Sequence, residues 1–221
     1  MTPSPQLMLN EAQEQVFESI ASDLIQQGYS IQHSALPLSL CSGLLYRISS
    51  MNEQDFHRAG TGRQQDHQLN TFVRRDRIHW LSSENTYEQA WLDYAGELQR
   101  YLNRRLFLGL FSYECHFAQY RPGDFYKKHM DAFQGQANRI LTTVLYLNPD
   151  WETQHKGELV IYDPQQQEQE LLRVMPRFGT LVTFLSEEFP HEVLPAERER
   201  YSIAGWFRLN SSNSLQPDPP A

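Results

Sequence analysis

The chain has 221 residues, of which 40% are hydrophobic and 12% aromatic, an ordinary composition for a globular protein with a substantial core. Its formal net charge of −8 argues against general electrostatic binding to nucleic acid or to an anionic membrane, although Arg74, Arg75 and Arg77 form a local basic cluster. No stretch is apolar enough to span a bilayer, the polar N-terminal segment is unlike a secretion signal, and Cys41 and Cys115 cannot make a disulfide framework. We therefore expect a cytoplasmic protein.

Three segments of the first half favour helices. Apolar residues recur at helical spacing from Asn10 to Gln27, and the apolar segment from Leu36 to Ile48 is expected to be helical as well. Polar capping residues then precede a strong apolar stripe between Tyr87 and Leu102, which predicts a third helix. Residues 56–70 are polar, contain two glycines and have no clear period, so we expect a long loop there.

After Arg105 the sequence changes to short runs rich in aromatic and β-branched residues, separated by turn sequences such as "RPGD", "NPDW" and "PRFG". These runs predict about seven strands, which is typical of a sandwich, a jelly roll or a small barrel. We therefore expect one α+β domain over residues 1–210, with mainly helical support in 1–105 and the β core in 106–210. Residues 211–221 offer little to bury and are expected to form a disordered tail.

His129 and Asp131, two residues that can bind a metal ion, stand two positions apart in "FYKKHMDAF". On a strand, positions i and i+2 project from the same face, so the imidazole and the carboxylate would point into the same space. With His191 from a distant strand, they would hold one face of an octahedral ion and leave three positions free, as in non-haem Fe(II) oxygenases. The spacing alone leaves open the alternative that these are ordinary structural residues.

Arg200 opens a further predicted strand nine positions after His191. A guanidinium matches a carboxylate through two parallel hydrogen bonds, so an arginine beside the metal could anchor a dicarboxylic cosubstrate. Arg198 and Arg208 are expected to be surface charges, and a solvated surface role is also the alternative for Arg200.

Five segments, read in order, closely resemble the 2-oxoglutarate- and Fe(II)-dependent prolyl 4-hydroxylases, and specifically the bacterial relatives of the animal hypoxia-inducible-factor prolyl hydroxylases. They are "RRDRIHWL", "YRPGDFYKKHMDAF", "RILTTVLYLNPDW", "GELVIYDP" and "PRFGTLVTFLSEEFPHEVLPAERERYSIAGWF". The resemblance extends over residues 72–207, and the combination is highly specific although each segment alone is not.

The resemblance implies a double-stranded β-helix, or jelly roll, with the N-terminal helices packed on its outside. It also implies that His129, Asp131 and His191 are the iron ligands and that Arg200 pairs with the distal carboxylate of 2-oxoglutarate. Two tyrosines join this cosubstrate site: Tyr146 would donate a hydrogen bond to the same carboxylate, and Tyr120 would line the pocket near the metal.

One position departs from the family pattern. Ala204 stands where the animal enzymes carry a threonine that helps to hold 2-oxoglutarate. Alanine cannot make that hydrogen bond, so the contacts to 2-oxoglutarate are expected to differ from those of the animal enzymes at this position.

The resemblance also points to a groove for a protein substrate. Asp76 and Arg139 align with a charged pair at the groove, and we hypothesise that they interact; Trp206 aligns with a tryptophan near the site of hydroxylation. The polar stretch 63–74 would be the finger loop that closes over the target.

The implied reaction is hydroxylation of a prolyl residue in a protein, using Fe(II), 2-oxoglutarate and O2, with succinate and CO2 as coproducts and ascorbate keeping the iron reduced. Elongation factor Tu is the first protein substrate that the bacterial resemblance suggests. An oxygenase acting on a small molecule, and a non-catalytic metal-binding jelly roll that serves as a sensor or interaction module, are the alternatives. The oligomeric state is not indicated.

Overall fold

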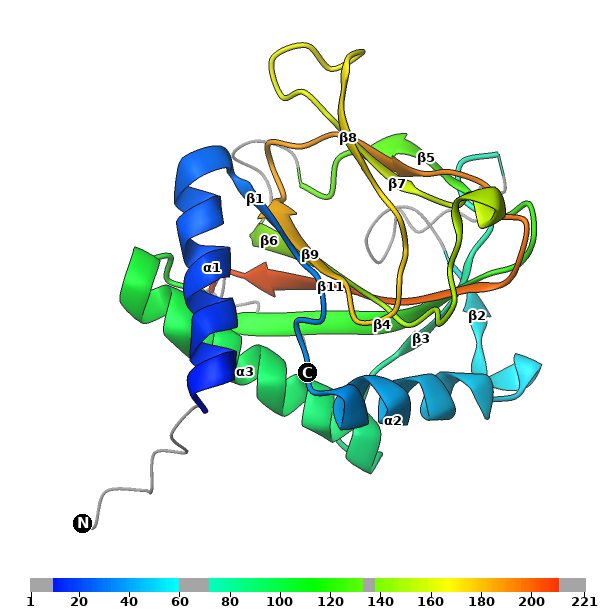
Figure 1. The fold of residues 1–221 in the computed structure, drawn as a ribbon, viewed down its shortest axis with the longest axis horizontal. Helices are drawn as coiled ribbons and strands as arrows, with labels where there is room; N and C mark the ends of the chain where they lie inside the picture. Colours follow the sequence, from blue (N-terminus) through cyan, green and yellow to red (C-terminus); the bar gives the residue numbers. More distant parts are fainter. Residues whose placement is uncertain (1–9, 60–71, 133–137, 211–221) are drawn as a thin grey trace, which may run out of the picture.

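The computed structural model describes residues 10–59, 72–132 and 138–210, which form two sheets with helices on one side (Figure 1). The helices are α1 (Glu11–Gln27), α2 (Leu38–Ser49) and α3 (Thr86–Leu106), with 3-10 turns η1 (Glu53–Asp55) and η3 (Thr153–His155). The larger sheet has the order β1-β9-β6-β11-β4-β3-β2 and the smaller sheet the order β5-β10-β7-β8. The strands are β1 (Tyr29–Gln32), β2 (His57–Arg58), β3 (Arg77–Trp80), β4 (Ser112–Tyr120), β5 (Tyr126–His129), β6 (Arg139–Tyr146), β7 (Leu159–Tyr162), β8 (Glu170–Val174), β9 (Leu181–Leu185), β10 (His191–Val193) and β11 (Arg200–Arg208).

The two long helices begin at capping asparagines. The side chain of Asn10 accepts a hydrogen bond from the backbone N–H of Gln13 at 2.8 Å, and Asn85 caps α3 in the same way. Helix α1 ends at Gly28, which adopts the left-handed conformation with φ 77° that glycine tolerates without strain. Local sequence therefore fixes where both helices start and where α1 stops.

The helices cover the outer face of the larger sheet, on the side away from the smaller sheet (Figure 1). A hydrophobic core fills this layer, because the apolar stripes of α1 and α3 meet every second residue of the central strands. The fully buried members of this core include Phe17, Ile20, Leu98, Leu102, Leu141, Leu145, Ile203 and Phe207.

A second hydrophobic cluster lies on the inner face, between the two sheets. Side chains alternate along a strand, so the residues of β11 that are out of phase with Ile203 and Phe207 project inward. The inward set carries the polar and small side chains on which the site depends: Arg200, Ser202, Ala204 and Trp206.

The predicted jelly roll with external helices is confirmed by the two facing antiparallel sheets. The described part of the second half contains eight strands, β4 to β11, rather than about seven. The first half is less purely helical than expected, because β1, β2 and β3 extend the larger sheet at its two edges. The predicted tail 211–221 and residues 63–71 of the predicted finger loop lie outside the described residues.

In the described ranges, no helix has the length and apolarity needed to cross a membrane.

Candidate metal centre and anion site

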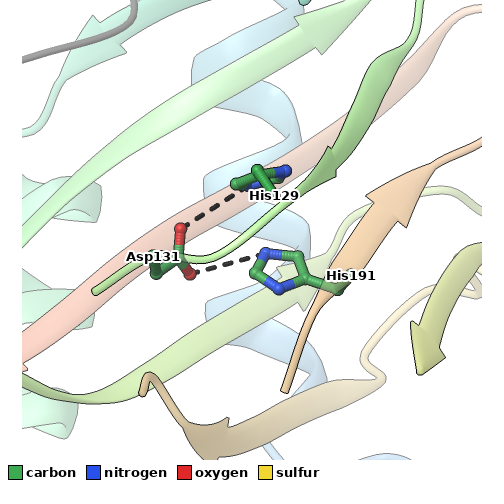
Figure 2. Close-up of side chains that lie close together, drawn as sticks. All are labelled: His129, Asp131 and His191. Carbon is green, nitrogen blue, oxygen red and sulfur yellow. Dashed lines mark ion pairs between the residues drawn. The ribbon is translucent and has the colours of Figure 1, made fainter. Parts of the chain in front are cut away.

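The structure brings His129, Asp131 and His191 together between the two sheets (Figure 2). His129 ends β5 and is the register partner of His191 on the adjacent strand β10. Asp131 Oδ1 lies 3.6 Å from His129 Nε2, and Asp131 Oδ2 lies 3.5 Å from His191 Nε2. His129 and Asp131 were expected on one strand, whereas β5 ends at His129 and Asp131 lies in the bend beyond it. Both side chains nevertheless point into the same space.

Backbone carbonyls orient both imidazoles. The Nδ1 atom of His129 lies 2.8 Å from the carbonyl oxygen of Lys127, and the Nδ1 atom of His191 lies 3.0 Å from that of Phe189. A carbonyl oxygen only accepts hydrogen bonds, so each Nδ1 carries the hydrogen and each Nε2 keeps its lone pair. Both lone pairs therefore face Asp131, which is the usual arrangement of metal-binding histidines whose other ring nitrogen is held by a carbonyl.

The buried groups hold the charges that a cation requires. Burial raises the pKa of the Asp131 carboxyl, but the facing imidazoles of His191 and His129 outweigh it and hold that pKa well below its usual range. Burial and the neighbouring His129 lower the pKa of His191 to about 4. At neutral pH the cluster thus offers a carboxylate and a neutral imidazole, the forms that bind a divalent cation.

Aromatic rings fix the ligand side chains further. Tyr126 stacks on His129 with 3.5 Å between ring centroids and 14° between planes, and the Arg74 guanidinium lies 4.3 Å from the centroid of Tyr126. Phe184 packs edge-on against His191 at 4.8 Å. These supports were not predicted from the sequence; a tyrosine three positions before His129 was a visible but unspecific signal.

Arg200 lies at the other end of the inner face and is buried, with 1% of its surface exposed. Its Nε and Nη1 atoms find no hydrogen-bond partner within the described ranges, and neither does the buried hydroxyl of Tyr146. The rings of Tyr120 and Tyr146 flank the guanidinium, with centroids 4.8 and 4.9 Å from its carbon. Because a buried cation without a counter-charge is costly, these orphaned donors fit an anionic ligand such as a carboxylate.

The two tyrosines remain hydrogen-bond donors at neutral pH. Burial raises the pKa of the Tyr120 hydroxyl well above its usual range, and it raises that of Tyr146 against the opposing effect of Arg200. A protonated hydroxyl beside a guanidinium adds a neutral donor to the charged one. The pair Arg200 and Tyr146 is therefore suited to one carboxylate rather than to a cation.

Strands β6 and β11 connect the two ends of the site. Thr142 on β6 donates a hydrogen bond to Asp131 at 2.7 Å, whereas Tyr146 on the same face of β6 lies beside Arg200. Between them, Val144 faces Ala204 across the register. Ala204 is only half-buried although it projects between the sheets, so solvent reaches the interior at this small residue.

The hypothesised pair of Asp76 and Arg139 is not formed. Asp76 is bound by Arg74 through hydrogen bonds of 2.8 and 2.6 Å, because Arg74 stands only two residues away on the same segment. Arg139 instead bonds Glu114 at 3.0 and 2.7 Å.

Glu114 also binds Arg208, which is 8% exposed and hydrogen-bonded to Asn138, so the expectation of a surface charge at Arg208 is wrong. Arg139 and Trp206 lie together, with the guanidinium carbon 3.8 Å from the centroid of the indole. The buried indole Nε1 of Trp206 makes no hydrogen bond of ordinary geometry within the described residues, but its N–H lies near enough to Asp131 to help lower the pKa of that carboxyl.

Comparison with known proteins supports one family. Residues 115–208 match the model of the 2OG-Fe(II) oxygenase superfamily. Over most of its length the chain is similar to the crystal structure of a prolyl-4-hydroxylase from Pseudomonas putida, with 35% sequence identity, 88% of this chain and 100% of that chain covered, and a TM-score of 0.79. It thus belongs to the prolyl 4-hydroxylase family of 2OG-Fe(II) oxygenases, whose members use Fe(II), 2-oxoglutarate and O2.

Two further relatives extend the comparison. A prolyl hydroxylase from Trichoplax adhaerens, solved in complex with a peptide fragment of the hypoxia-inducible-factor oxygen degradation domain, is 25% identical, with 89% of this chain and 90% of that chain covered and a TM-score of 0.77. Egl nine homolog 1 of Rattus norvegicus is 35% identical over 86 residues, which are 38% of this chain. The aligned part spans 25% of the length of that rat protein.

Proposed function

We propose that the chain is a 2-oxoglutarate-dependent dioxygenase that hydroxylates a prolyl residue in a protein substrate. The observation that carries this proposal is the presence, between the same two sheets, of a donor set for a divalent cation and of a buried guanidinium, Arg200, whose Nε and Nη1 have no hydrogen-bond partner among the described residues. Either feature by itself is compatible with proteins of many kinds. Together they match the two groups, a ferrous ion and a dicarboxylate, after which the family is named.

The residues take the following roles. His129, Asp131 and His191 hold the Fe(II) ion, Arg200 binds the distal carboxylate of 2-oxoglutarate, and Tyr146 donates a hydrogen bond to it. Tyr120 lines the same pocket and packs against the guanidinium at 4.8 Å. When bound, Fe(II) and 2-oxoglutarate supply the activation of dioxygen, and succinate and CO2 leave as coproducts.

The protein's own contribution is orientation and exclusion of water. Carbonyls of Lys127 and Phe189 keep both Nε2 lone pairs directed at Asp131, so the donor set is formed before any ion arrives. The ligand-bearing residue His191 is 5% exposed, and the apolar cluster between the sheets surrounds it, which limits the access of bulk water. These features favour reaction at a bound C–H bond over unproductive turnover.

We also propose that Asp76, Arg139 and Trp206 line the groove for the substrate. Arg139 and Asp76 are each neutralised by another residue, so their role is to shape the groove rather than to pair with one another. Trp206 lies in the same region, with its indole ring against the Arg139 guanidinium and its N–H beside the Asp131 carboxyl. Elongation factor Tu is the protein substrate that we propose to test first.

The reaction is tested by peptide mass spectrometry of bacterial elongation factor Tu, and of lysate proteins, after incubation with the enzyme, Fe(II), 2-oxoglutarate and ascorbate. We expect the mass of one oxygen atom to be added to a proline, and no addition with His129→Ala. Formation of succinate without modification of any protein would favour the small-molecule alternative. Absence of succinate would favour the non-catalytic sensor or interaction module.

A further inference from the structure

A pair of buried hydroxyls lies directly behind the Asp131 carboxylate. Thr142 Oγ1 donates a hydrogen bond to Asp131 Oδ2 at 2.7 Å and lies 2.9 Å from Ser186 Oγ. Thr142 is 2% exposed and Ser186 is fully buried. Neither residue belongs to the donor set or to the anion site. The binding of metal and cosubstrate therefore does not explain why two hydroxyls are buried here.

Hydrogen counting fixes the direction of this hydrogen-bond chain. The ionised carboxylate can only accept, so the single hydroxyl hydrogen of Thr142 is committed to Asp131. Ser186 must then donate to Thr142. The backbone N–H of Ser186 donates to the carbonyl of Ile140 at 3.0 Å, which ties Ser186 to the strand that carries Thr142. The order of donors is therefore Ser186, Thr142, Asp131.

This order makes the two carboxylate oxygens unequal. Oδ2 accepts the bond from Thr142, whereas Oδ1 lies 3.6 Å from His129 Nε2, and the indole N–H of Trp206 also interacts with the carboxyl group. An ion held by both imidazoles would find the lone pairs of Oδ1 available. A carboxylate that bound through both oxygens would occupy two positions of an octahedral ion instead of one.

We propose that Thr142, oriented by Ser186, is a positioning residue that engages Oδ2 of Asp131, so that the carboxylate gives one oxygen to the metal ion. Three positions then stay open for the cosubstrate and dioxygen. The inference rests on the proposed function, because it requires that the donor set binds an ion. It adds to that function a reason for the single-oxygen binding mode.

Thr142→Val tests the inference, since valine keeps the shape of threonine and removes the donor. The dissociation constant of Mn(II) is measured for the purified chain by calorimetry, and bound water is counted by the broadening of the Mn(II) resonance in water enriched with a magnetic oxygen isotope. We expect Mn(II) binding to weaken about tenfold and bound water to decrease. Thr142→Ser should restore both values.

Thr143→Val is the matched control. Thr143 is the next residue of β6 and is equally buried, but its hydroxyl lies 2.8 Å from the Tyr113 hydroxyl on the other face of the strand. Its Mn(II) affinity should equal that of the wild type. If Thr142→Val does not fold, Ser186→Ala provides a second test. This variant keeps the Thr142 hydroxyl but removes the donor that orients it, so it should still weaken Mn(II) binding relative to Thr143→Val.

The possible failures are distinguishable. If Thr142→Val binds Mn(II) as tightly as the wild type and retains the same bound water, the positioning role is wrong and the proposed function stands. Failure of the folded wild type to bind Mn(II) would overturn the proposed metal site and this inference with it.

Discussion

The burial of Arg200 is difficult to explain by a contribution to the stability of the fold. It is 1% exposed, and two of its nitrogens lack partners within the described residues. Uncompensated burial of a charge costs several kcal/mol, so the protein without a ligand carries a destabilised side chain. An anionic ligand such as a carboxylate would remove that cost, which makes binding at this point selective for anions.

Arg200→Met should therefore separate binding from stability. We expect 2-oxoglutarate binding, measured by calorimetry, to be lost, while the free energy of unfolding in urea without cosubstrate rises by about 1–3 kcal/mol. Arg198→Met is the control, because Arg198 stacks on Trp151 at 5.1 Å rather than lying buried in the site. A loss of stability in Arg200→Met would show that an internal partner satisfies the guanidinium.

His116 is a second residue whose burial has a measurable consequence. It is 3% exposed and lies between Trp80 and Trp206, with ring centroids 5.2 and 5.5 Å away. Burial, reinforced by the charge of Arg74, lowers the pKa of His116 from 6.5 to about 4. The unfolded chain therefore binds more protons between these pH values, and stability falls as the pH is lowered through that range.

His116→Gln should reduce this acid sensitivity. The loss of unfolding free energy between neutral pH and pH 4 is expected to be smaller than in the wild type by up to about 3 kcal/mol. A residual loss should persist, because the pKa of His191 is lowered in the same way. Urea unfolding at a series of pH values gives the comparison, and parallel curves for the two proteins would contradict the assignment to His116.

At the scale of elements, β11 is the strand on which the site depends, because it pairs with both β4 and β6 and carries Arg200, Ala204 and Trp206. Its outer face must admit the Tyr113 side chain, which crosses the strand to bond Thr143. Gly205 makes this crossing possible. A Cβ there would lie 2.6 Å from Tyr113 Cζ and 2.7 Å from Cys115 Cβ.

Gly205→Ala should consequently destabilise the protein by at least about 2 kcal/mol, because both neighbours belong to packed strands and cannot move apart freely. Gly96→Ala is the matched control. Gly96 lies within α3, and its added Cβ would meet only the flexible end of Arg100 at 3.6 Å. Alanine is the better helix former, so that variant should gain up to about 1 kcal/mol in urea unfolding. Equal stability of the two variants would contradict the close packing at Gly205.

For the whole molecule, the sequence alone predicted the structural features that depend on residues close together in the chain. Helical periodicity and capping asparagines place α1 and α3, and alternation with turn residues indicates the β core. Long-range pairing was less accessible: strands β1 and β3 join the larger sheet through partners far along the chain, such as Tyr29 with Phe184. A periodic pattern predicts that a strand forms but not which distant strand it pairs with.

In the site, too, some features could be predicted from the sequence and others could not. The convergence of His129, Asp131 and His191 could be anticipated from the family resemblance, whereas the expectation that His129 and Asp131 share one strand was wrong. The Thr142 bond to Asp131 and the stacking of Tyr126 on His129 could not, since a threonine or tyrosine on a core strand is most often ordinary packing. The pairing of Asp76 with Arg74 was missed because a family resemblance shows which positions correspond but not which side chains form hydrogen bonds with one another.

The most direct test of the central claim is the release of succinate from 2-oxoglutarate when anaerobically Fe(II)-loaded protein is exposed to oxygen in the presence of substrate protein. We predict succinate from the wild type and only background levels from His129→Ala and Arg200→Met. Equal release by the wild type and His129→Ala would show that the three side chains do not form the reactive centre.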